Sequence, residues 1–467
     1  MKKIYKNILC VLALGITFAS CEDYLDDVPK GSKVPTTLAD YEAFIRDEYT
    51  NQMVNVAQAL NLMNDNFVTT ATLAANRLTN ANYMWDESAN RLDLNQADET
   101  TYYGQYAAIS TFNLIIENAL TTTEATEADQ RIVWAEAKML RAMSYFNLVN
   151  FYADTYTTAN ASKLAVPLIT SASINAPSKQ VTIQEMYDFI LKDVNEAISY
   201  LPKVSQTALH PNLGAGYAFS ARVYLQMNNY TEANKYADLA LTENNKLYDW
   251  VAFYNSNKAI IDVPNSYTTI ASPMGYNYTE NYTFRHGSNR SLARELSIPV
   301  ERAQRFETGD VRFKSRWKLR TVGTDTYYYS TLSGMYNFGG ITTVEVYLIK
   351  AECLARTNQV TEALTFLNTV RKTRILPADY ADITATDAAT ALNAIFKTKR
   401  NELILTIIPF ADARRLNAEG VYPVSFSKMA NGTPYTLSAN SHMWTMPFPQ
   451  GAVKNPGNGT ITQNVDK

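Results

Sequence analysis

Cysteine is almost absent from this chain of 467 residues, which contains 3. Cys10 lies in an apolar leader and Cys21 comes soon after it, so Cys353 is the only cysteine in the rest of the chain. One remaining thiol excludes a framework of intramolecular disulfides. Stability therefore has to come from a packed hydrophobic core, and the chain is long enough to bury one.

Glycine, charge and long apolar runs are also scarce. The 17 glycines are about half of the ~7% that is usual in proteins. Few positions remain for tight turns and hairpins, which favours helices over sheets. Charged residues make up 19% of the chain and the net charge is −3, so no basic surface indicates nucleic acid as a partner. The apolar stretch at residues 8–18 is too short to cross a bilayer as a helix, which takes about 20 residues.

The first residues have the layout of a secretory signal, in which a basic start precedes an apolar stretch and two small residues. Small residues just before a cysteine resemble a bacterial lipobox, with Phe18 where leucine is more usual. We therefore expect residues 1–20 to be removed as a signal peptide and Cys21 to carry lipid. The alternative is a soluble secreted protein in which Cys21 is incidental. The signal consists of Lys2, Lys3 and Lys6, residues 8–18, Ala19 and Ser20.

Two segments of the chain match each other. Residues 220–241 read SARVYLQMNNYTEANKYADLAL and residues 350–370 read KAECLARTNQVTEALTFLNTV, and their alignment places Ala233 on Ala363. Apolar residues recur at intervals of three and four on both sides of a short polar break. This pattern predicts two antiparallel helices that meet through small side chains. The spacing is typical of the tetratricopeptide repeat, whose alanines let paired helices approach closely.

Further helical patterns surround these two segments. Residues 131–152 carry one apolar stripe and are expected to pair with residues 183–201, a segment that is followed by Pro202. Residues 103–120 and 388–407 also have the pattern of helices. The sequence thus predicts a mostly α fold with a tetratricopeptide-like helical-repeat scaffold. The repeats are expected within about residues 103–250 and 344–418.

Residues 251–343 lose the helical period and contain glycines and prolines, among them Pro264, Gly275 and Gly309. Short strands are expected around residues 326–332. Long loops inside a compact protein are usually functional or disordered, and disordered linkers avoid the aromatic rings in which this segment is rich. We therefore predict a long, irregular, loop-rich insertion that is ordered and faces the ligand.

The motifs of several enzyme classes are missing. A glycoside hydrolase needs two carboxylates about 5 to 10 Å apart. The sequence offers Asp86 with Glu87, or Asp98 with Glu99, and nothing favours either pair over a solvated surface. The 3 histidines lie far apart and form no His-Glu-x-x-His helix, and there is no Gly-x-Ser-x-Gly turn and no phosphate loop. We expect no catalytic residue, no metal and no cofactor.

Five segments, taken together and in their order, indicate a protein family more specifically than any one of them does alone. They are SCEDYLDDVP, AEAKMLRAMSYFNLVNFY with AVPLI, EVYLIKAECLAR with VTEALTFLNTVRKTR, KRNELIL, and MPFPQGAVKNPGNGTITQN. Over nearly its full length the chain resembles the SusD/RagB family of outer-membrane nutrient-binding lipoproteins. It departs from the family after KRNELIL. An acidic residue, a glycine and a basic residue are usual there before Asp412, whereas this chain has Thr406, Ile407 and Pro409.

The resemblance implies a helical-repeat scaffold that caps a TonB-dependent, SusC-like outer-membrane transporter and presents oligosaccharide to it. It also implies that the acidic residues after Cys21 are an export signal, which would place the lipid-anchored protein on the exterior of the outer membrane. The alternatives are a peptide ligand, which some relatives take, a helical glycoside hydrolase, and a scaffold that holds a protein partner on a concave repeat face.

The ligand-binding residues follow from the chemistry of sugars. A sugar has an apolar face and a rim of hydroxyls, so its binder needs flat rings and planar polar groups. Residues 83–106 and 275–290 supply both. The resemblance implies that the segment before the first helix of the array contributes ligand rings, and packing in the core is the alternative for each ring. The expected ligand-binding residues are Trp85, Tyr102, Tyr103, Tyr276, Tyr278, Tyr282, Trp317 and Tyr328.

Overall fold

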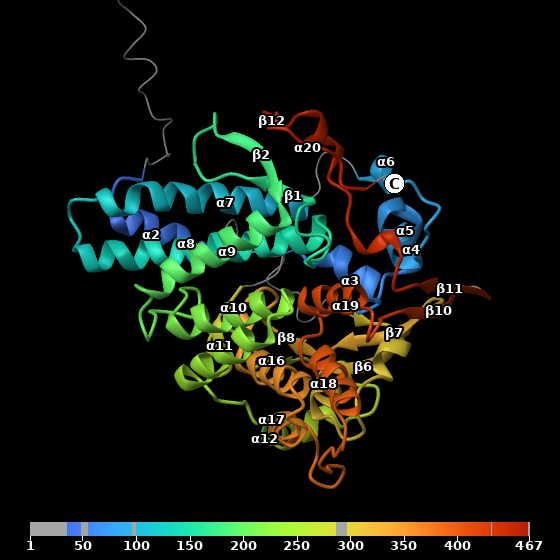
Figure 1. Ribbon diagram of the computed structural model, residues 1–467. Helices are drawn as coiled ribbons and strands as arrows, with labels where there is room; N and C mark the ends of the chain where they lie inside the picture. The colour runs from blue at the N-terminus through green and yellow to red at the C-terminus, as the bar shows by residue number, and fades with distance from the viewer. Residues whose placement is uncertain (1–34, 48–54, 96–99, 286–296, 431, 466–467) are drawn as a thin grey trace, which may run out of the picture.

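The computed structural model describes residues 35–47, 55–95, 100–285, 297–430 and 432–465. The expected signal peptide and Cys21 lie outside these residues. Figure 1 shows a stack of helices that runs from α7 and α8 at one end to α12 and α17 at the other. One hydrophobic core cluster includes residues from Leu38 to Ile461, so both ends of the described chain pack against the stack.

The stack begins with α7 (Thr100–Asn118), α8 (Glu127–Tyr152) and α9 (Ile183–Ile198), and α8 contacts both of its neighbours. Helix α9 starts with a capping box, because Thr182 and Glu185 satisfy each other's backbone N–H groups. A buried ion pair joins α8 to α9, with Arg141 Nε 2.8 Å from Asp193 Oδ2. The predicted pairing of residues 131–152 with 183–201 is confirmed.

Two helix hairpins form the middle of the stack. Helix α10 (Leu213–Gln226) packs on α11 (Tyr230–Glu243), and α16 (Thr343–Arg356) packs on α17 (Val360–Lys372). Helix α11 contacts α16, which places the hairpins side by side. Alanines at the predicted positions have no exposed surface and let the helices approach closely. The mostly α, tetratricopeptide-like fold is confirmed.

The stack ends with α18 (Ala388–Glu402) and α19 (Ile408–Glu419). Helix α18 stops five residues before the predicted end at residue 407, and α19 begins with Pro409 in its first turn. Proline restricts the residue before it and lacks an N–H, so it favours the start of a new helix over continuation of the old one. Leu405 in the turn has φ 72°, a left-handed conformation that is unusual for leucine.

The stretch 251–343 contains more regular structure than the sequence predicts. It opens with helix α12 (Trp250–Ile261), whose N-cap Asp249 accepts a hydrogen bond from Ala252 N. The expectation that residues 251–343 lack a helical period is therefore wrong for the first part of this stretch, through Ile261. Strands at residues 317–322 and 325–330 form an antiparallel hairpin, which overlaps the predicted strand. The elements after α12 are β3 (Ile270–Ala271), β4 (Asn281–Thr283), β5 (Ser297–Ile298), α14 (Val300–Ala303), α15 (Val311–Arg316), β6 (Trp317–Val322), β7 (Asp325–Ser330), β8 (Leu332–Ser333) and β9 (Ile341–Thr342).

Short elements from both ends of the chain pack at one side of the stack. The fully buried Arg91 joins them, because its Nη2 donates to the carbonyl oxygens of His442 (3.3 Å) and Thr445 (3.0 Å). These elements are α3 (Ala57–Met63), α4 (Thr70–Ala75), α5 (Arg77–Met84), α6 (Arg91–Leu94), β10 (Phe426–Ala430), β11 (Thr433–Leu437), η2 (His442–Trp444), α20 (Gln450–Lys454) and β12 (Asn458–Thr460). Helix α2 (Leu38–Arg46) lies apart from them and contacts α8.

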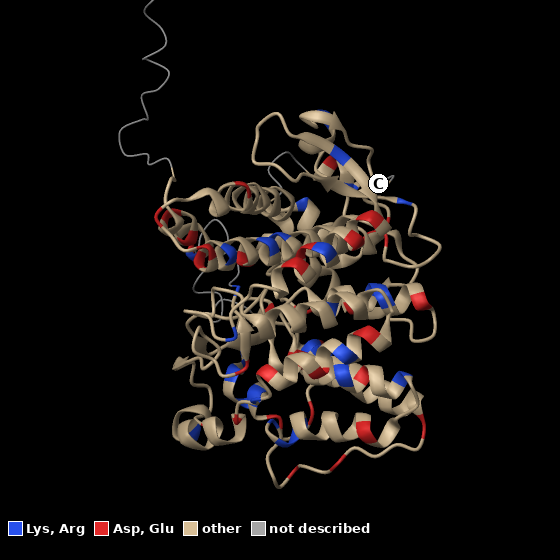
Figure 2. Cartoon of the chain, turned by 60° about the vertical axis from the view of Figure 1, so that its left-hand side comes forward, with Lys and Arg blue, Asp and Glu red and all other residues tan. Residues whose placement is uncertain are grey.

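Charge is distributed evenly over the described part of the chain. Figure 2 shows acidic and basic residues interspersed along the stacked helices, in keeping with the net charge of −3. Among the helices of the described ranges, none is both long enough and apolar enough to cross a bilayer.

Candidate functional site

An open groove of about 440 Å³ lies beside α7 at the first end of the stack. Figure 1 shows the parts that form it next to one another: α7, the hairpin of β1 (Leu164–Leu168) and β2 (Pro177–Thr182), and the segment around α20 and β12. The groove is lined by Tyr102, Tyr103, Tyr106, Ile109, Ser110, Ile169, Ser171, Ala172, Ser173, Ile174, Ala176, Ser178, Ala452, Asn455, Pro456, Gly457, Asn458 and Ile461.

Tyrosine rings form one wall of the groove. The ring of Tyr103, which is partly exposed, stands edge-on to the buried ring of Tyr102, with the centroids 5.4 Å apart. Tyr102 in turn packs against Tyr152 (5.3 Å) and Phe448 (5.8 Å). Edge-to-face contacts of this kind fix the orientation of rings. Tyr103 therefore presents part of its surface to the groove from a rigid support.

Tyr106 continues this wall one helical turn after Tyr102, although it is absent from the rings expected to bind ligand. Its hydroxyl donates to the carbonyl oxygen of Pro167 at 2.7 Å, which ties α7 to strand β1. Burial raises the pKa of Tyr106 well above its usual value. The phenol consequently stays neutral. Helical i, i+4 spacing from Tyr102 is the sequence signal that identifies this residue.

Serines and asparagines form the opposite rim. Asn113 Nδ2 donates to the carbonyl oxygens of Ile169 (3.1 Å) and Ser171 (3.2 Å), which holds the loop after β1 over α7. Asn458 Nδ2 donates to the carbonyl oxygen of Asn175 at 2.8 Å, which joins that loop to the C-terminal segment. The rim is thus fixed by side-chain hydrogen bonds to backbone groups, and its hydroxyl and amide groups can act as donors and acceptors.

The C-terminal wall depends on a close strand contact. Strand β12 pairs in parallel with β2, and Gly459 lies opposite Ser178. A Cβ atom at position 459 would come 1.8 Å from the carbonyl oxygen of Ser178. Only glycine permits this approach without displacing the strand.

The described lining of the groove is uncharged. Among the described residues that line it, none is Asp, Glu, Lys, Arg or His. It combines an aromatic surface with neutral hydrogen-bonding groups, which is the chemistry that suits an uncharged ligand with apolar faces and hydroxyls. The described part of this lining also contains no carboxylate pair of the kind that glycoside hydrolysis needs.

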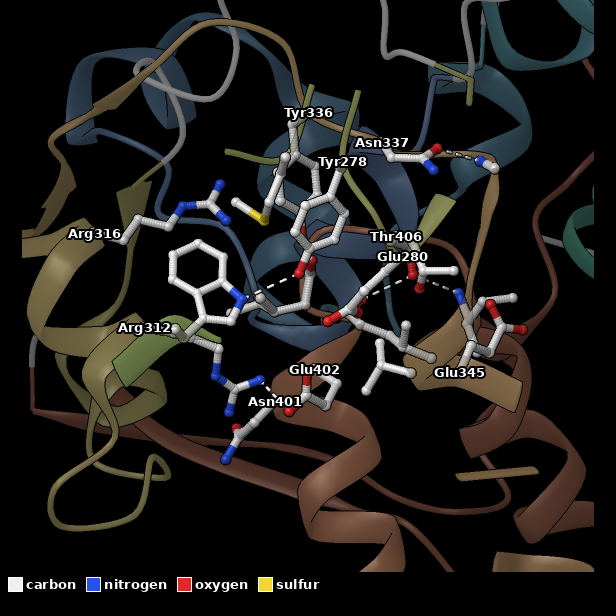
Figure 3. A pocket seen from close by; sticks show the side chains of 18 of the residues that line it. Tyr278, Glu280, Arg312, Arg316, Tyr336, Asn337, Glu345, Asn401, Glu402 and Thr406 are labelled. Carbon is white, nitrogen blue, oxygen red and sulfur yellow. Dashed lines mark hydrogen bonds and ion pairs between the residues drawn. The ribbon is translucent and has the colours of Figure 1, made fainter. Parts of the chain in front are cut away.

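Two other predicted rings line an internal cavity of about 70 Å³ between the insertion and the turn after α18 (Figure 3). Trp317 is buried there, and the buried Tyr278 accepts a hydrogen bond from Trp250 Nε1 at 3.1 Å. The cavity also contains acidic side chains, but these are engaged in ion pairs. Glu280, for example, lies 2.6 Å from Arg374 Nη2.

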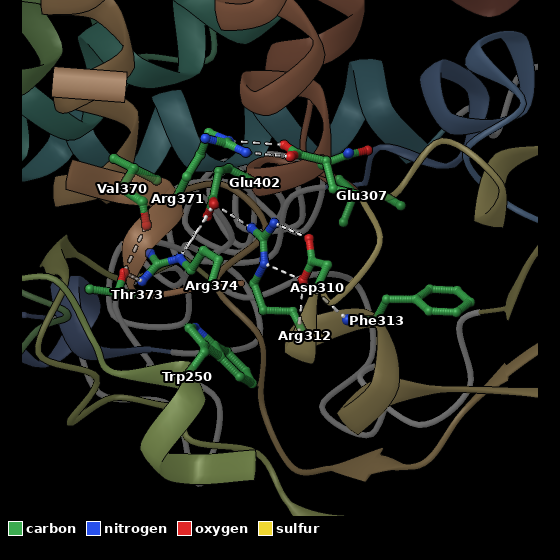
Figure 4. A network of polar contacts seen from close by, with 12 residues as sticks. Trp250, Glu307, Asp310, Arg312, Phe313, Val370, Arg371, Thr373, Arg374 and Glu402 are labelled. Atoms are coloured by element: carbon green, nitrogen blue, oxygen red, sulfur yellow. Dashed lines mark hydrogen bonds and ion pairs between the residues drawn. The ribbon is translucent and has the colours of Figure 1, made fainter. Parts of the chain in front are cut away.

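Figure 4 shows how the charges beneath this cavity are paired. Glu402 lies between Arg312 and Arg374, with Arg374 Nε at 3.3 Å, and Asp310 holds Arg312 at 2.6 Å. Burial raises the pKa of Glu402, although both arginines oppose the shift. The network joins α15 to α17 and α18, so we assign these carboxylates a structural role.

Trp85 and Tyr282 line neither the groove beside α7 nor the internal cavity. Trp85 is 4% exposed, and its Nε1 donates to the carbonyl oxygen of Leu62 at 2.9 Å. Tyr282 is 2% exposed, packs against Gly214 of α10 and donates to the carbonyl oxygen of Ala240 at 2.8 Å. Neither ring has a face open to a ligand in this conformation. Both polar tips find backbone acceptors, as buried aromatic residues require.

The last two predicted rings belong to the insertion. Tyr276 packs edge-on against Phe284 at 4.6 Å, and Tyr328 packs against Phe313 at 5.2 Å. The structure also reveals a partly exposed pair that the sequence does not predict. Phe67 stacks on Tyr327 with centroids 4.5 Å apart, so the segment before α4 meets strand β7.

Of the two carboxylate pairs considered for hydrolysis, the structure describes one. Asp86 and Glu87 are exposed, and Asp86 accepts hydrogen bonds from Ser88, which is an ordinary arrangement for a turn. Asp98 and Glu99 lie outside the described residues.

Comparisons with known proteins agree with this architecture. A family model described as SusD-like, starch-binding and associating with the outer membrane, matches residues 23–225. A SusD-like protein of Formosa agariphila is 25% identical over 162 residues, which are 32% of this chain and 30% of that relative. The match therefore spans about a third of each protein.

Solved structures resemble nearly the whole chain. A SusD superfamily protein from Bacteroides thetaiotaomicron superposes with a TM-score of 0.68 and covers 92% of this chain and 100% of its own. One from Bacteroides vulgatus superposes with a TM-score of 0.69 and covers 92% of this chain and 99% of its own. Each is 17% identical to this chain, a level at which the likeness establishes the fold.

Proposed function

We propose that this chain, which belongs to the SusD/RagB family, binds a neutral oligosaccharide at the outer membrane in the groove beside α7. The description of the matched family, starch-binding and associating with the outer membrane, supports the ligand class and the location. The observation that carries the proposal is the composition of the groove. Its described lining combines tyrosine rings with serine and asparagine and contains no charged residue.

The arrangement of the groove suits a sugar chain. The exposed surface of Tyr103 can stack on the C–H face of one sugar ring, while the rim of Ser171, Ser173 and Asn455 can exchange hydrogen bonds with its hydroxyls. The volume of about 440 Å³ falls within the ~300–1,000 Å³ range of small-molecule sites. An open groove also lets a longer chain continue beyond the subsite.

The same composition supports binding without cleavage. Hydrolysis of a glycosidic bond requires a general acid and a second carboxylate, or an equivalent base. The carboxylates around the internal cavity are engaged by arginines, and they lie away from the groove. We therefore propose that the protein holds its ligand and leaves it intact.

Delivery to a transporter completes the proposal. A lipid on Cys21 would hold the protein at the outer membrane, and the family resemblance supports a TonB-dependent, SusC-like transporter as the partner. The rigid helical stack offers a broad surface for a permanent complex, and such interfaces bury about 2,000 Å² or more. The protein would act as a lid that captures oligosaccharide and passes it to the barrel.

A glycan array probed with the full-length protein in mild detergent tests the ligand class. We expect signals from neutral oligosaccharides and none from unglycosylated peptides of similar length. Exclusive binding of peptides, or of glycans whose affinity depends on carboxylate or sulfate groups, would contradict the proposal. The glycans that bind are then incubated with the protein, and the reducing ends are measured. More reducing ends than in glycan incubated with buffer alone would show that the protein is a hydrolase.

A further inference from the structure

Arg316 is a buried cation at the wall of the internal cavity. It is the last residue of α15 and is 4% exposed. Its guanidinium lies between two rings, with Cζ 4.6 Å from the centroid of Trp317 and 4.6 Å from that of Tyr336. Figure 3 shows the side chain reaching from the edge of the cavity toward its centre. The position is therefore rigid and shielded from solvent.

The guanidinium is left without a carboxylate among the described residues. Its Nε and Nη2 atoms are buried and have no hydrogen-bond partner there. Each of the three acids of the cavity lining is paired elsewhere: Glu280 with Arg374 (2.6 Å), Glu345 with Arg222 (2.7 Å), and Glu402 with Arg312 and Arg374. The pairing of Glu280 is through Oε1, and its Oε2 has no hydrogen-bond partner among the described residues. Arg316 thus differs from the arginines of the neighbouring network, each of which has an acidic partner.

A buried unpaired charge is unfavourable unless something compensates it. Burial lowers the pKa of Arg316. A guanidinium nevertheless stays protonated at neutral pH. Cation–π contacts with the rings of Trp317 and Tyr336 supply part of the compensation. The Nε and Nη2 groups of Arg316, which lines the cavity, still lack acceptors among the described residues, and a bound anion would satisfy both.

The size of the cavity limits what can bind. A water molecule needs about 10–15 Å³ of such space, so the cavity of about 70 Å³ has room for roughly five to seven waters, or for a small anion with a few waters. Trp250, Tyr278 and Phe306 also line the cavity, and ring edges carry partial positive charge that favours an anion.

We propose that the internal cavity is a binding site for a small inorganic monoanion of the chloride class, held by Nε and Nη2 of Arg316 between Trp317 and Tyr336. The anion would link the insertion to the helical stack, because the hydroxyl of Tyr336 donates to the carbonyl oxygen of Ile404 at 3.0 Å in the turn after α18. This site is separate from the groove beside α7 and does not depend on the proposed oligosaccharide.

Bromide, which scatters anomalously, is the probe for a direct test. A crystal of the full-length protein grown in bromide should show an anomalous peak within hydrogen-bond distance of Arg316 Nε and Nη2. Water density at that place, with bromide only on the surface, would overturn the proposal. This measurement uses the unaltered protein, so it does not depend on the folding of any variant.

Thermal unfolding tests whether binding matters in solution. Potassium bromide replaces potassium gluconate at constant ionic strength, because gluconate is too large for the cavity. Above the Kd of bromide, the Tm should rise by about 1–2 °C for each tenfold increase in the bromide concentration. Arg316→Met should lose this dependence, whereas Arg131→Met, at a side chain that is 37% exposed on α8, should keep it. A bromide peak in the crystal without any dependence of Tm on bromide would indicate an adventitious ion only and would reject the proposal.

Discussion

Tyr102 and Tyr103 are neighbours in the sequence but have different surroundings. Successive residues of a helix point about 100° apart. Both rings line the groove, but Tyr102 is buried against the core whereas Tyr103 is partly exposed. Tyr102 is 4% exposed and touches four other rings. The two positions therefore separate a packing role from a binding role within one turn of α7.

Tyr103→Ala should weaken oligosaccharide binding about tenfold or more, because a stacked aromatic ring contributes roughly 1–2 kcal/mol. The change should leave the Tm nearly unaltered, since Tyr103 is partly exposed. Isothermal titration calorimetry with a glycan that the array identifies measures the affinity, and calorimetric unfolding measures the Tm.

Tyr102→Ala and Tyr327→Ala provide the matched comparisons. Tyr102→Ala should unfold at lower temperature, because truncating a buried aromatic residue costs about 3–5 kcal/mol. Tyr327→Ala removes a ring on the insertion that stacks on Phe67 and should keep full affinity. If Tyr327→Ala lost binding while Tyr103→Ala retained it, the ligand site would lie at the insertion.

Glu136 makes the stability depend on pH. It is buried on α8, and burial together with the nearby Glu42 raises its pKa to about 8, while Arg285 opposes the shift. A carboxyl with a raised pKa stabilises the fold at low pH, and this contribution is lost as pH rises through about 8. Between pH 5 and pH 8 the free energy of unfolding should therefore fall, by at most about 1.4 kcal/mol per pH unit from this group.

Glu136→Gln should remove that slope, because the amide is neutral in both states. Urea unfolding at pH 5, 6, 7 and 8 measures the free energy of unfolding of both proteins. At each step to higher pH, the value for the variant should rise relative to that of the wild type. Parallel curves for the two proteins would show that the carboxyl is already ionised in the folded state.

At the scale of elements, the helix hairpins are the part of the fold that the sequence predicts well. The contacts within α10–α11 and α16–α17 join helices that follow each other directly, so local periodicity and small residues such as Ala233 and Ala363 are sufficient. Helix α12 is missed because the glycines and prolines that follow it dominate the pattern, although Trp250, Tyr254 and Ile261 lie buried on one face.

The groove could not be predicted from sequence patterns in the same way. Its walls come from three segments, and the hydrogen bond of Asn458 to Asn175 joins residues 283 positions apart. Strand β12 has three residues, too few for a periodic signal. Residue type alone does not distinguish the partly exposed Tyr103 from the buried Trp85.

Strand β12 should be required for the groove but not for the helical stack. Gly459→Val places a side chain against the carbonyl oxygen of Ser178, which should separate β12 from β2. We expect a large loss of affinity with helical circular dichroism unchanged. Gly104→Ala on α7 is the matched control, because a Cβ atom there meets nothing within 4 Å. An affinity for Gly459→Val equal to that of the wild type would show that β12 is not part of the site.

At the scale of the whole molecule, the proposed lid predicts a stable partner. The full-length protein, extracted from its native membranes in mild detergent, should co-purify with a β-barrel transporter. Cys21→Ser should lose metabolic labelling with an alkyne fatty acid and be recovered in the soluble fraction. Recovery of the wild type as a lone monomer, even after cross-linking in intact cells, would contradict the lid and favour an independent binding protein.

The position of a bound oligosaccharide tests the central claim most directly. A crystal structure of the protein with the highest-affinity glycan from the array should show a sugar ring stacked on Tyr103, with hydroxyls bonded to the serine and asparagine rim. The same density should be absent from crystals of Tyr103→Ala soaked at equal concentration. A glycan bound over the Phe67–Tyr327 pair, or anywhere outside the groove, would contradict the account.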